Sequence, residues 1–164
     1  MKLTLLGTGT STGVPSIGCE CETCTSDDPR DQRLRVSVLV EHGAPFCLGP
    51  DFNVTPVEVI HGRLPVTAYR FNDFAYATDL SEIPPRSLEL LRDLDVLVLD
   101  CLRVTPPHPT HLWLEPALAY IEELRPRRAY LTHIAHDIKH ARDSKLLPAG
   151  VEWAYDGLEI SAED

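Results

Sequence analysis

Two stretches far apart in the chain carry its most specific pattern: Gly18-Cys19-Glu20-Cys21-Glu22-Thr23-Cys24 and Leu131-Thr132-His133-Ile134-Ala135-His136. Three cysteines within six positions can reach one metal ion, and a tetrahedral site needs one more ligand. The candidate for that ligand is His136. The pattern predicts a structural zinc, held by Cys19, Cys21, Cys24 and His136, that fixes the N-terminal loop against the end of the fold.

A redox pair formed by Cys21 and Cys24 is the rival interpretation of the cysteine cluster. Such a pair favours a helix that starts after its first cysteine. Residues 25–29, Thr-Ser-Asp-Asp-Pro, are instead typical of a loop. The sequence therefore favours metal. The other two cysteines, Cys47 and Cys101, lie in apolar stretches and are interpreted as small core residues.

Composition sets limits on the partners of the chain. The formal net charge of the 164 residues is -10, which argues against binding a nucleic-acid polymer. A small anionic substrate stays compatible, because bound divalent ions can reverse the local field. No apolar run approaches the roughly 18 residues of a membrane helix, and residues 1–7 are too short for a signal peptide. We expect a cytoplasmic protein without membrane contact, and a homodimer is left open.

The periodicity predicts one α+β domain spanning residues 1–164, with strands early and then strands alternating with helices. We expect strands at 3–6, 35–40, 57–60, 67–71, 74–77, 95–100 and 128–132. Helices are expected at 85–92, from Thr110 as cap to about 124, and at 137–147. Pro116 conflicts mildly with the second helix, unless it starts near Glu115. A closing hairpin is expected from 151–155 and 158–160 across Asp156-Gly157.

A second group of polar residues follows predicted strands directly: His61, Asp79 and His133. Strand ends hold side chains rigidly at the rim of a cleft, as a metal site requires. Imidazole and carboxylate together suit zinc, manganese or iron. Simpler roles exist, since Asp79 could cap a following helix and His111 could sit in the first turn of its helix. For His42, His108 and His140, a surface or core role is the favoured interpretation.

Taken in order, six short motifs resemble the metallo-β-lactamase superfamily: Thr8-Gly9-Thr10-Ser11, the 18–24 cluster, Val59-Ile60-His61-Gly62, Ala77-Thr78-Asp79, Val98-Leu99-Asp100 and the 131–136 stretch. Within the superfamily they are most similar to PhnP-type phosphodiesterases, which hydrolyse cyclic phosphodiesters. The resemblance extends from residue 3 to residue 160. It implies a four-layer αββα sandwich with a two-metal site at one edge of the β layers.

The resemblance also implies roles for individual residues. His61 would ligate the first of two divalent ions, Mn²⁺ or Zn²⁺, Asp79 would bridge both ions, and His133 would ligate the second. His111 matches a histidine that contacts the substrate phosphate and can act as general acid. The residues Cys19, Cys21, Cys24 and His136 match a separate structural zinc. The implied reaction is attack of a metal-activated hydroxide on a small phosphodiester.

One departure from the family is serious, because the signature His-x-His-x-Asp-His is absent. It would belong between Leu48 and Val57. Two explanations remain: the protein contains an internal segment between about residues 48 and 54 that this sequence lacks, with the signature inside it, or the chain is a truly shortened relative with a broken site. The first is favoured, because losing core elements leaves an apolar face bare while every downstream ligand is kept.

Two other functions stay open at this stage. A PqqB-like branch of the family has a similar cysteine cluster and serves cofactor biosynthesis. A non-catalytic module stabilised by zinc is the second alternative, and it would bind one metal without hydrolysing phosphodiesters. The natural substrate and the catalytic metal are not determined by the sequence.

Overall fold

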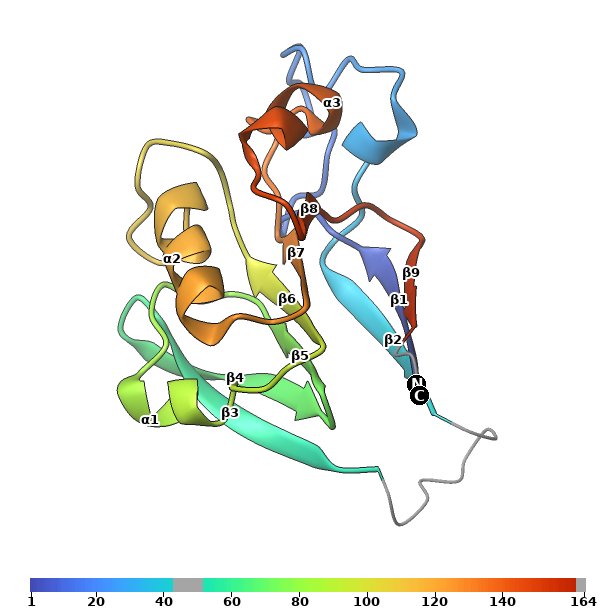
Figure 1. Ribbon diagram of the computed structural model, residues 1–164. Helices are drawn as coiled ribbons and strands as arrows, with labels where there is room; N and C mark the ends of the chain where they lie inside the picture. The colour runs from blue at the N-terminus through green and yellow to red at the C-terminus, as the bar shows by residue number, and fades with distance from the viewer. Residues whose placement is uncertain (43–51, 162–164) are drawn as a thin grey trace.

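The computed structural model describes residues 1–42 and 52–161, and within them two β-sheets pack face to face (Figure 1). The smaller sheet is antiparallel, with order β2-β1-β9, and contains β1 (Lys2–Gly7), β2 (Ser37–Glu41) and β9 (Leu158–Ser161). The larger sheet has order β3-β4-β5-β6-β7-β8. Its strands are β3 (Val54–His61), β4 (Leu64–Phe71), β5 (Phe74–Ala77), β6 (Val96–Asp100), β7 (Arg128–Thr132) and β8 (Val151–Trp153).

The strand β6 shows why the larger sheet forms the centre of the molecule. All five of its residues are buried, as its continuous apolar run predicts for a strand covered on both faces. Val96 and Val98 face the core between the sheets, while Leu97 and Leu99 face the core under the helices. The strands β5, β6, β7 and β8 pair in parallel, whereas β3, β4 and β5 pair antiparallel.

Helices cover the outer face of the larger sheet, where α1 (Pro85–Glu89) and α2 (Leu114–Leu124) lie (Figure 1). The short α3 (His140–Asp143) and the 3-10 turns η1 (Pro29–Asp31) and η2 (Ser144–Leu146) lie at the end of the sandwich. The predicted α+β class is thus confirmed. In residues 1–42 and 52–161, no helix covers the outer face of the smaller sheet, so the fourth layer of an αββα sandwich is not seen there.

Three local predictions are wrong. The second helix begins at Leu114 with Trp113 as its cap, so Thr110 does not cap it, as the conflict at Pro116 had indicated. The helix expected at 137–147 is shortened to α3 and η2. Side-chain carboxylates accept hydrogen bonds from amides at the start of α3. Lys139 N–H donates to Asp143 Oδ2 and His140 N–H donates to Asp31 Oδ1 (both 2.8 Å).

The closing hairpin is the third error, because β8 and β9 belong to different sheets. The Asp156 carboxylate directs the crossing. It accepts hydrogen bonds from the Thr8 amide and hydroxyl and from the Leu34 amide, at 2.6–2.8 Å. These bonds tie the turn to β1 and the 33–36 segment instead of closing it on β8.

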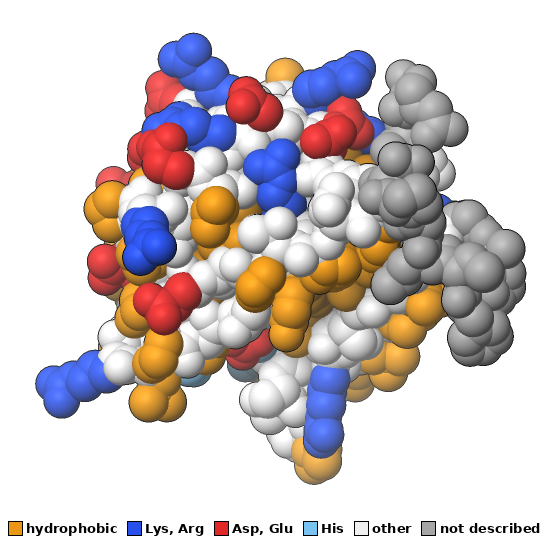
Figure 2. Space-filling model, turned by 90° about the horizontal axis from the view of Figure 1, so that it is seen from below, with side chains coloured by type: hydrophobic (Ala, Val, Ile, Leu, Met, Phe, Trp, Pro, Cys, Tyr) orange, Lys and Arg blue, Asp and Glu red, His pale blue; other side chains and the backbone are white. Residues whose placement is uncertain are grey.

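Among the described residues, the larger sheet extends beyond the smaller one. Tyr69 of β4 lies opposite Tyr76 of β5, which is part of the core between the sheets, yet Tyr69 is 45% exposed. Val54 of β3, on the same face, is equally exposed. Seen from below, hydrophobic side chains gather in a band across the surface (Figure 2). Cys47 lies in residues 43–51, outside the described residues. Most of the junction at about residues 48–54, where an absent segment is expected, lies there too.

Candidate metal centres

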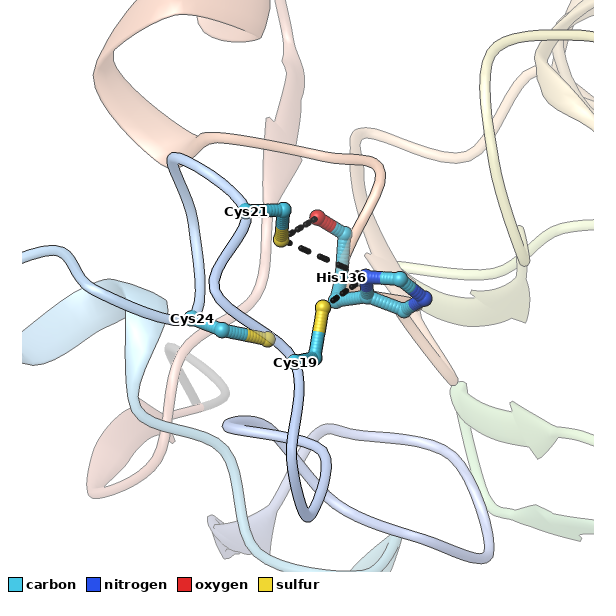
Figure 3. A group of neighbouring side chains, drawn as sticks. All are labelled: Cys19, Cys21, Cys24 and His136. Carbon is cyan, nitrogen blue, oxygen red and sulfur yellow. Dashed lines mark hydrogen bonds between the residues drawn. The ribbon is translucent and has the colours of Figure 1, made fainter.

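The four zinc-ligand candidates converge. Cys19, Cys21, Cys24 and His136 each offer a ligand atom within 4.8 Å of the others (Figure 3). His136 Nδ1 lies 3.6 Å from the Cys19 sulfur and 3.4 Å from the Cys21 sulfur. In a tetrahedron with metal–sulfur bonds near 2.3 Å and metal–nitrogen bonds near 2.0 Å, that edge is roughly 3.5 Å. The group, called the closed site below, therefore fits a zinc ion.

The thiols of the closed site differ in acidity. The hydrogen bond from His136 is the main cause that lowers the pKa of Cys21 to about 6, while burial raises the pKa of Cys24 to about 11. A bound cation would favour the thiolate at all three cysteines. Residues 22–25 form a turn and no helix starts directly after Cys21, so the redox interpretation lacks its helix. Cys101, outside the group, is fully buried as expected.

A buried ion pair positions the loop that carries the cysteines. Arg33 donates to the carbonyls of Ala135 (3.1 Å) and Ile138 (2.9 Å), on either side of His136, and to Asp31 Oδ1 (3.1 Å). Both charged side chains are fully buried. At the surface, Glu22 pairs with Lys139 and Arg142. The buried pair contributes more to this placement, because exposed pairs are screened by solvent.

The second group lies at the carboxyl ends of β3, β5, β6 and β7, which point to one edge of the larger sheet. Asp79, His111 and His133 offer ligand atoms within 4.8 Å of one another. The ring of His61 lies 4.6 Å from that of His111 but is not part of this closest group. The structure thus brings the candidates together at the strand ends. We call Asp79, His111 and His133, with His61 beside them, the open site.

Backbone strain marks the open site. Asp79 and His133 have positive φ angles of 57° and 60°, a region that non-glycine residues seldom occupy. His133 follows β7 directly, and Asp79 lies two residues after the end of β5. No helix begins near Asp79, since α1 starts at Pro85 with Pro84 as its cap, so the helix-capping interpretation of Asp79 is wrong.

Hydrogen bonds fix the tautomers of two histidines in the open site. His61 Nδ1–H donates to the Thr110 carbonyl (2.8 Å), and His111 Nδ1–H donates to Asp100 Oδ2 (3.1 Å). In the neutral rings the lone pair therefore lies on Nε2. Gly62 allows the approach of Thr110, because a Cβ there would lie 2.8 Å from Thr110 Cγ2. Burial lowers the pKa of His133, which keeps this imidazole neutral as a metal ligand requires.

Asp100 is a site residue to which sequence reasoning gave no role. Its carboxylate is fully buried and accepts hydrogen bonds from the Asp79 amide (2.7 Å) and from His111. Burial raises its pKa, and its Oδ1 has no partner among the described residues. A buried carboxylate with an unpaired oxygen needs nearby positive charge. A cation bound by Asp79, His111 and His133 would supply that charge, so the residues present fit a divalent ion.

His111 lies before α2 and not in its first turn, and the backbone on its C-terminal side is held firmly. The Leu112 amide donates to the Leu80 carbonyl (2.8 Å), and the Leu112 carbonyl accepts from the Leu102 amide (2.9 Å). His108 and His140 stay outside both groups. Nδ1 of His108 lies near Thr110, and His140 Nε2–H donates to the Trp153 carbonyl (3.2 Å).

Comparisons with known proteins agree with this architecture. A family model described as the β-lactamase superfamily domain matches residues 21–134. A solved structure described as a new diphosphatase from the PhnP family is 32% identical, with a TM-score of 0.90 over 99% of this chain and 98% of that one. Zinc-bound PqqB from Methylobacterium extorquens shares the fold at 13% identity, with a TM-score of 0.74 over 99% of this chain and all of that one.

A curated relative, an octanoyltransferase of Porphyromonas gingivalis, is 25% identical to this chain. The match covers the whole chain and 52% of that protein, so the chain spans about half the length of this relative. The aligned region is 256 residues long, 92 more than the 164 residues of this chain. No helix in the described part of the chain is long and apolar enough to cross a membrane.

Proposed function

Because the chain belongs to the metallo-β-lactamase superfamily, we propose that it is a metal-dependent hydrolase of small phosphodiesters, cyclic phosphodiesters included. The observation that carries the proposal is the convergence of Asp79, His111 and His133, with His61 beside them, at one edge of the larger sheet. The 32% identical relative is described as a diphosphatase of the PhnP family, which supports chemistry at phosphorus.

The open site suits phosphoryl chemistry. A divalent ion held there would polarise phosphoryl oxygens and lower the pKa of water towards neutrality. The chain itself supplies the placement: Asp100 orients His111 and also accepts the amide of Asp79, so one buried carboxylate sets two site residues. The free Nε2 of His111 can act on the phosphoryl group or on the ion beside it. The net charge of -10 favours a small substrate over a nucleic-acid polymer.

The closed site is proposed to hold a structural zinc that takes no part in the reaction. Its four protein ligands fill a tetrahedral shell, whereas a catalytic zinc keeps one position open for water or substrate. The zinc would hold the 18–24 loop against the segment after β7. Through His133 and His136, three residues apart, that segment contributes to both sites.

We further propose that a segment between about residues 48 and 54 is absent from this chain relative to the family. Three observations support this: the missing signature, the longer aligned region of the relative, and the exposed inner face at Val54 and Tyr69. The denatured mass of the purified protein tests it. A mass equal to that of 164 residues would mean that the segment is truly missing and would leave the open site as described. A larger mass, with peptide mapping that puts the extra residues at this junction, would mean that the protein carries the segment.

Activity is tested with purified protein, Mn²⁺ or Zn²⁺, and three substrates: bis-p-nitrophenyl phosphate, a 2′,3′-cyclic nucleotide and a nucleoside diphosphate. We expect turnover of the first two that stops when a chelator is added. Hydrolysis of the diphosphate alone would replace the phosphodiester proposal by a diphosphatase. Absence of turnover with all three, in metal-loaded protein, would leave the non-catalytic module as the function.

A further inference from the structure

The chain has few imidazoles for a centre with two ions. Its seven histidines include four with other contacts: His136 near the cysteines, His140 on Trp153, His108 near Thr110 and His42 stacked on Phe52. Only His61, His111 and His133 remain. A catalytic zinc usually has three protein ligands, so two ions call for about six donor groups unless carboxylates are shared.

The geometry of the open site centres on one position. Asp79, His111 and His133 offer one ligand atom each within 4.8 Å, whereas His61 lies outside this group. The rings of His111 and His133 stack at 4.5 Å with an interplanar angle of 18°. Two imidazoles side by side, next to a carboxylate, form a set that one divalent ion can bind.

His111 has the surroundings of a metal ligand. Its Nδ1–H is bound by a buried carboxylate, the arrangement that orients metal-bound histidines and makes their other nitrogen more basic. Its side chain is only 12% exposed. The backbone hydrogen bonds of the next residue, Leu112, through its amide and its carbonyl, hold His111 in place.

We infer that the chain of 164 residues, without the signature segment, holds a single divalent ion at the open site through Asp79, His111 and His133, so that His111 is a metal ligand. This differs from the substrate role that the family resemblance gives His111, and it rests on the proposed function for the use of the site. Two imidazoles and one carboxylate accept Mn²⁺, Fe²⁺ or Zn²⁺. They leave positions free for water and for a phosphoryl oxygen. His61 lies beside the ion.

The test is a Mn²⁺ titration of protein that has been dialysed against a moderate chelator, so that zinc stays only in the closed site. Binding is monitored through the electron paramagnetic resonance signal of free Mn²⁺. Mn²⁺ prefers oxygen and imidazole ligands and avoids the thiolates of the closed site. We expect one Mn²⁺ per chain, bound at least about tenfold more weakly by His111→Ala. Spin-echo modulation should show two coordinated imidazoles in the parent protein and one in the variant. His108→Ala is the matched control, because His108 is the neighbouring histidine outside the group, and its binding should be unchanged.

Two Mn²⁺ per chain, or an unchanged affinity in His111→Ala, would overturn the inference. If His111→Ala also loses zinc or its circular dichroism, Asp79→Asn decides, since it preserves side-chain shape and should weaken Mn²⁺ binding to the same degree. Retained affinity in Asp79→Asn would then overturn the inference. Normal Mn²⁺ binding without turnover of bis-p-nitrophenyl phosphate would contradict the proposed function but not the ligand set.

Discussion

The closed site and the open site are built differently although residues 133–136 contribute to both. In the closed site, three sulfurs and one nitrogen come from a loop and from the segment after β7, and together they complete a tetrahedral shell. In the open site, Asp79 and His133 lie after separate strands and His111 comes from the segment between β6 and α2, and the shell is incomplete. A complete shell stabilises a fold, and an incomplete one leaves room for substrate. Variants of the closed site should therefore change stability, and variants of the open site should change activity and metal binding.

Asp79→Ala should have the largest effect on activity. It removes the only carboxylate of the closest ligand group, so turnover should fall by more than the roughly 10–100-fold that loss of an outer-shell partner causes. The zinc of the closed site should remain. Steady-state kinetics and metal analysis check both expectations. Turnover comparable to that of the parent would refute the role of Asp79.

Cys21→Ser should have the largest effect on stability. Zinc bound only by the folded state adds its binding free energy to folding, so losing a thiolate should release the ion and lower the melting temperature by more than about 5 °C. Zinc content and thermal unfolding are the measurements. The control is Cys101→Ala, a buried cysteine outside the group, which should retain zinc. Retained zinc in Cys21→Ser would contradict the closed site.

Asp100→Asn tests how the open site is positioned. Loss of the negative charge weakens the bond that orients His111, and the affinity of the open site for Mn²⁺ should fall about 10–100-fold. Zinc in the closed site should not change. Asp95→Asn, just before the amino end of the same strand and paired with Arg128, is the control and should bind Mn²⁺ normally. Equal affinities in the two variants would show that Asp100 does not position the site.

His140→Gln should have the smallest effect, which is a change in how the stability of the fold depends on pH. Burial lowers the pKa of His140, so the unfolded chain takes up a proton near pH 6.5 before the folded chain does. Stability contributed by the neutral imidazole is present above pH 6.5 and is lost as the pH falls towards the folded pKa. Glutamine can keep the donor to the Trp153 carbonyl without titrating. Urea unfolding at pH 7.0 and 5.5 should give a smaller difference in the variant, and an identical difference would contradict this account.

The sequence predicted those parts of the molecule whose signal is local. The apolar run of β6 can only be a strand buried on both faces, and Asn72-Asp73 at the turn between β4 and β5 marks a hairpin. The spacing of Cys19, Cys21 and Cys24 was also sufficient to predict that their sulfurs lie together, because a short loop connects them. These features depend on neighbours in the sequence.

Two features that depend on distant residues escaped prediction. The Asp156-Gly157 pair is typical of a hairpin turn, but Thr8 and Leu34 bind its carboxylate and send the chain into the other sheet. Asp100 gained its role only from packing against Asp79 and His111. Its signal was a carboxylate at the end of a wholly apolar strand, which is a sensible place to look for a buried site residue.

The measurement that tests the contrast most directly is zinc K-edge X-ray absorption on the protein after dialysis against a moderate chelator. The account predicts one retained zinc, with three sulfurs at about 2.3 Å and one nitrogen at about 2.0–2.1 Å, because the chelator removes metal only from the incomplete shell. A retained zinc with only nitrogen and oxygen neighbours would place the tightly held ion in the open site. That result would contradict the assignment of the two sites.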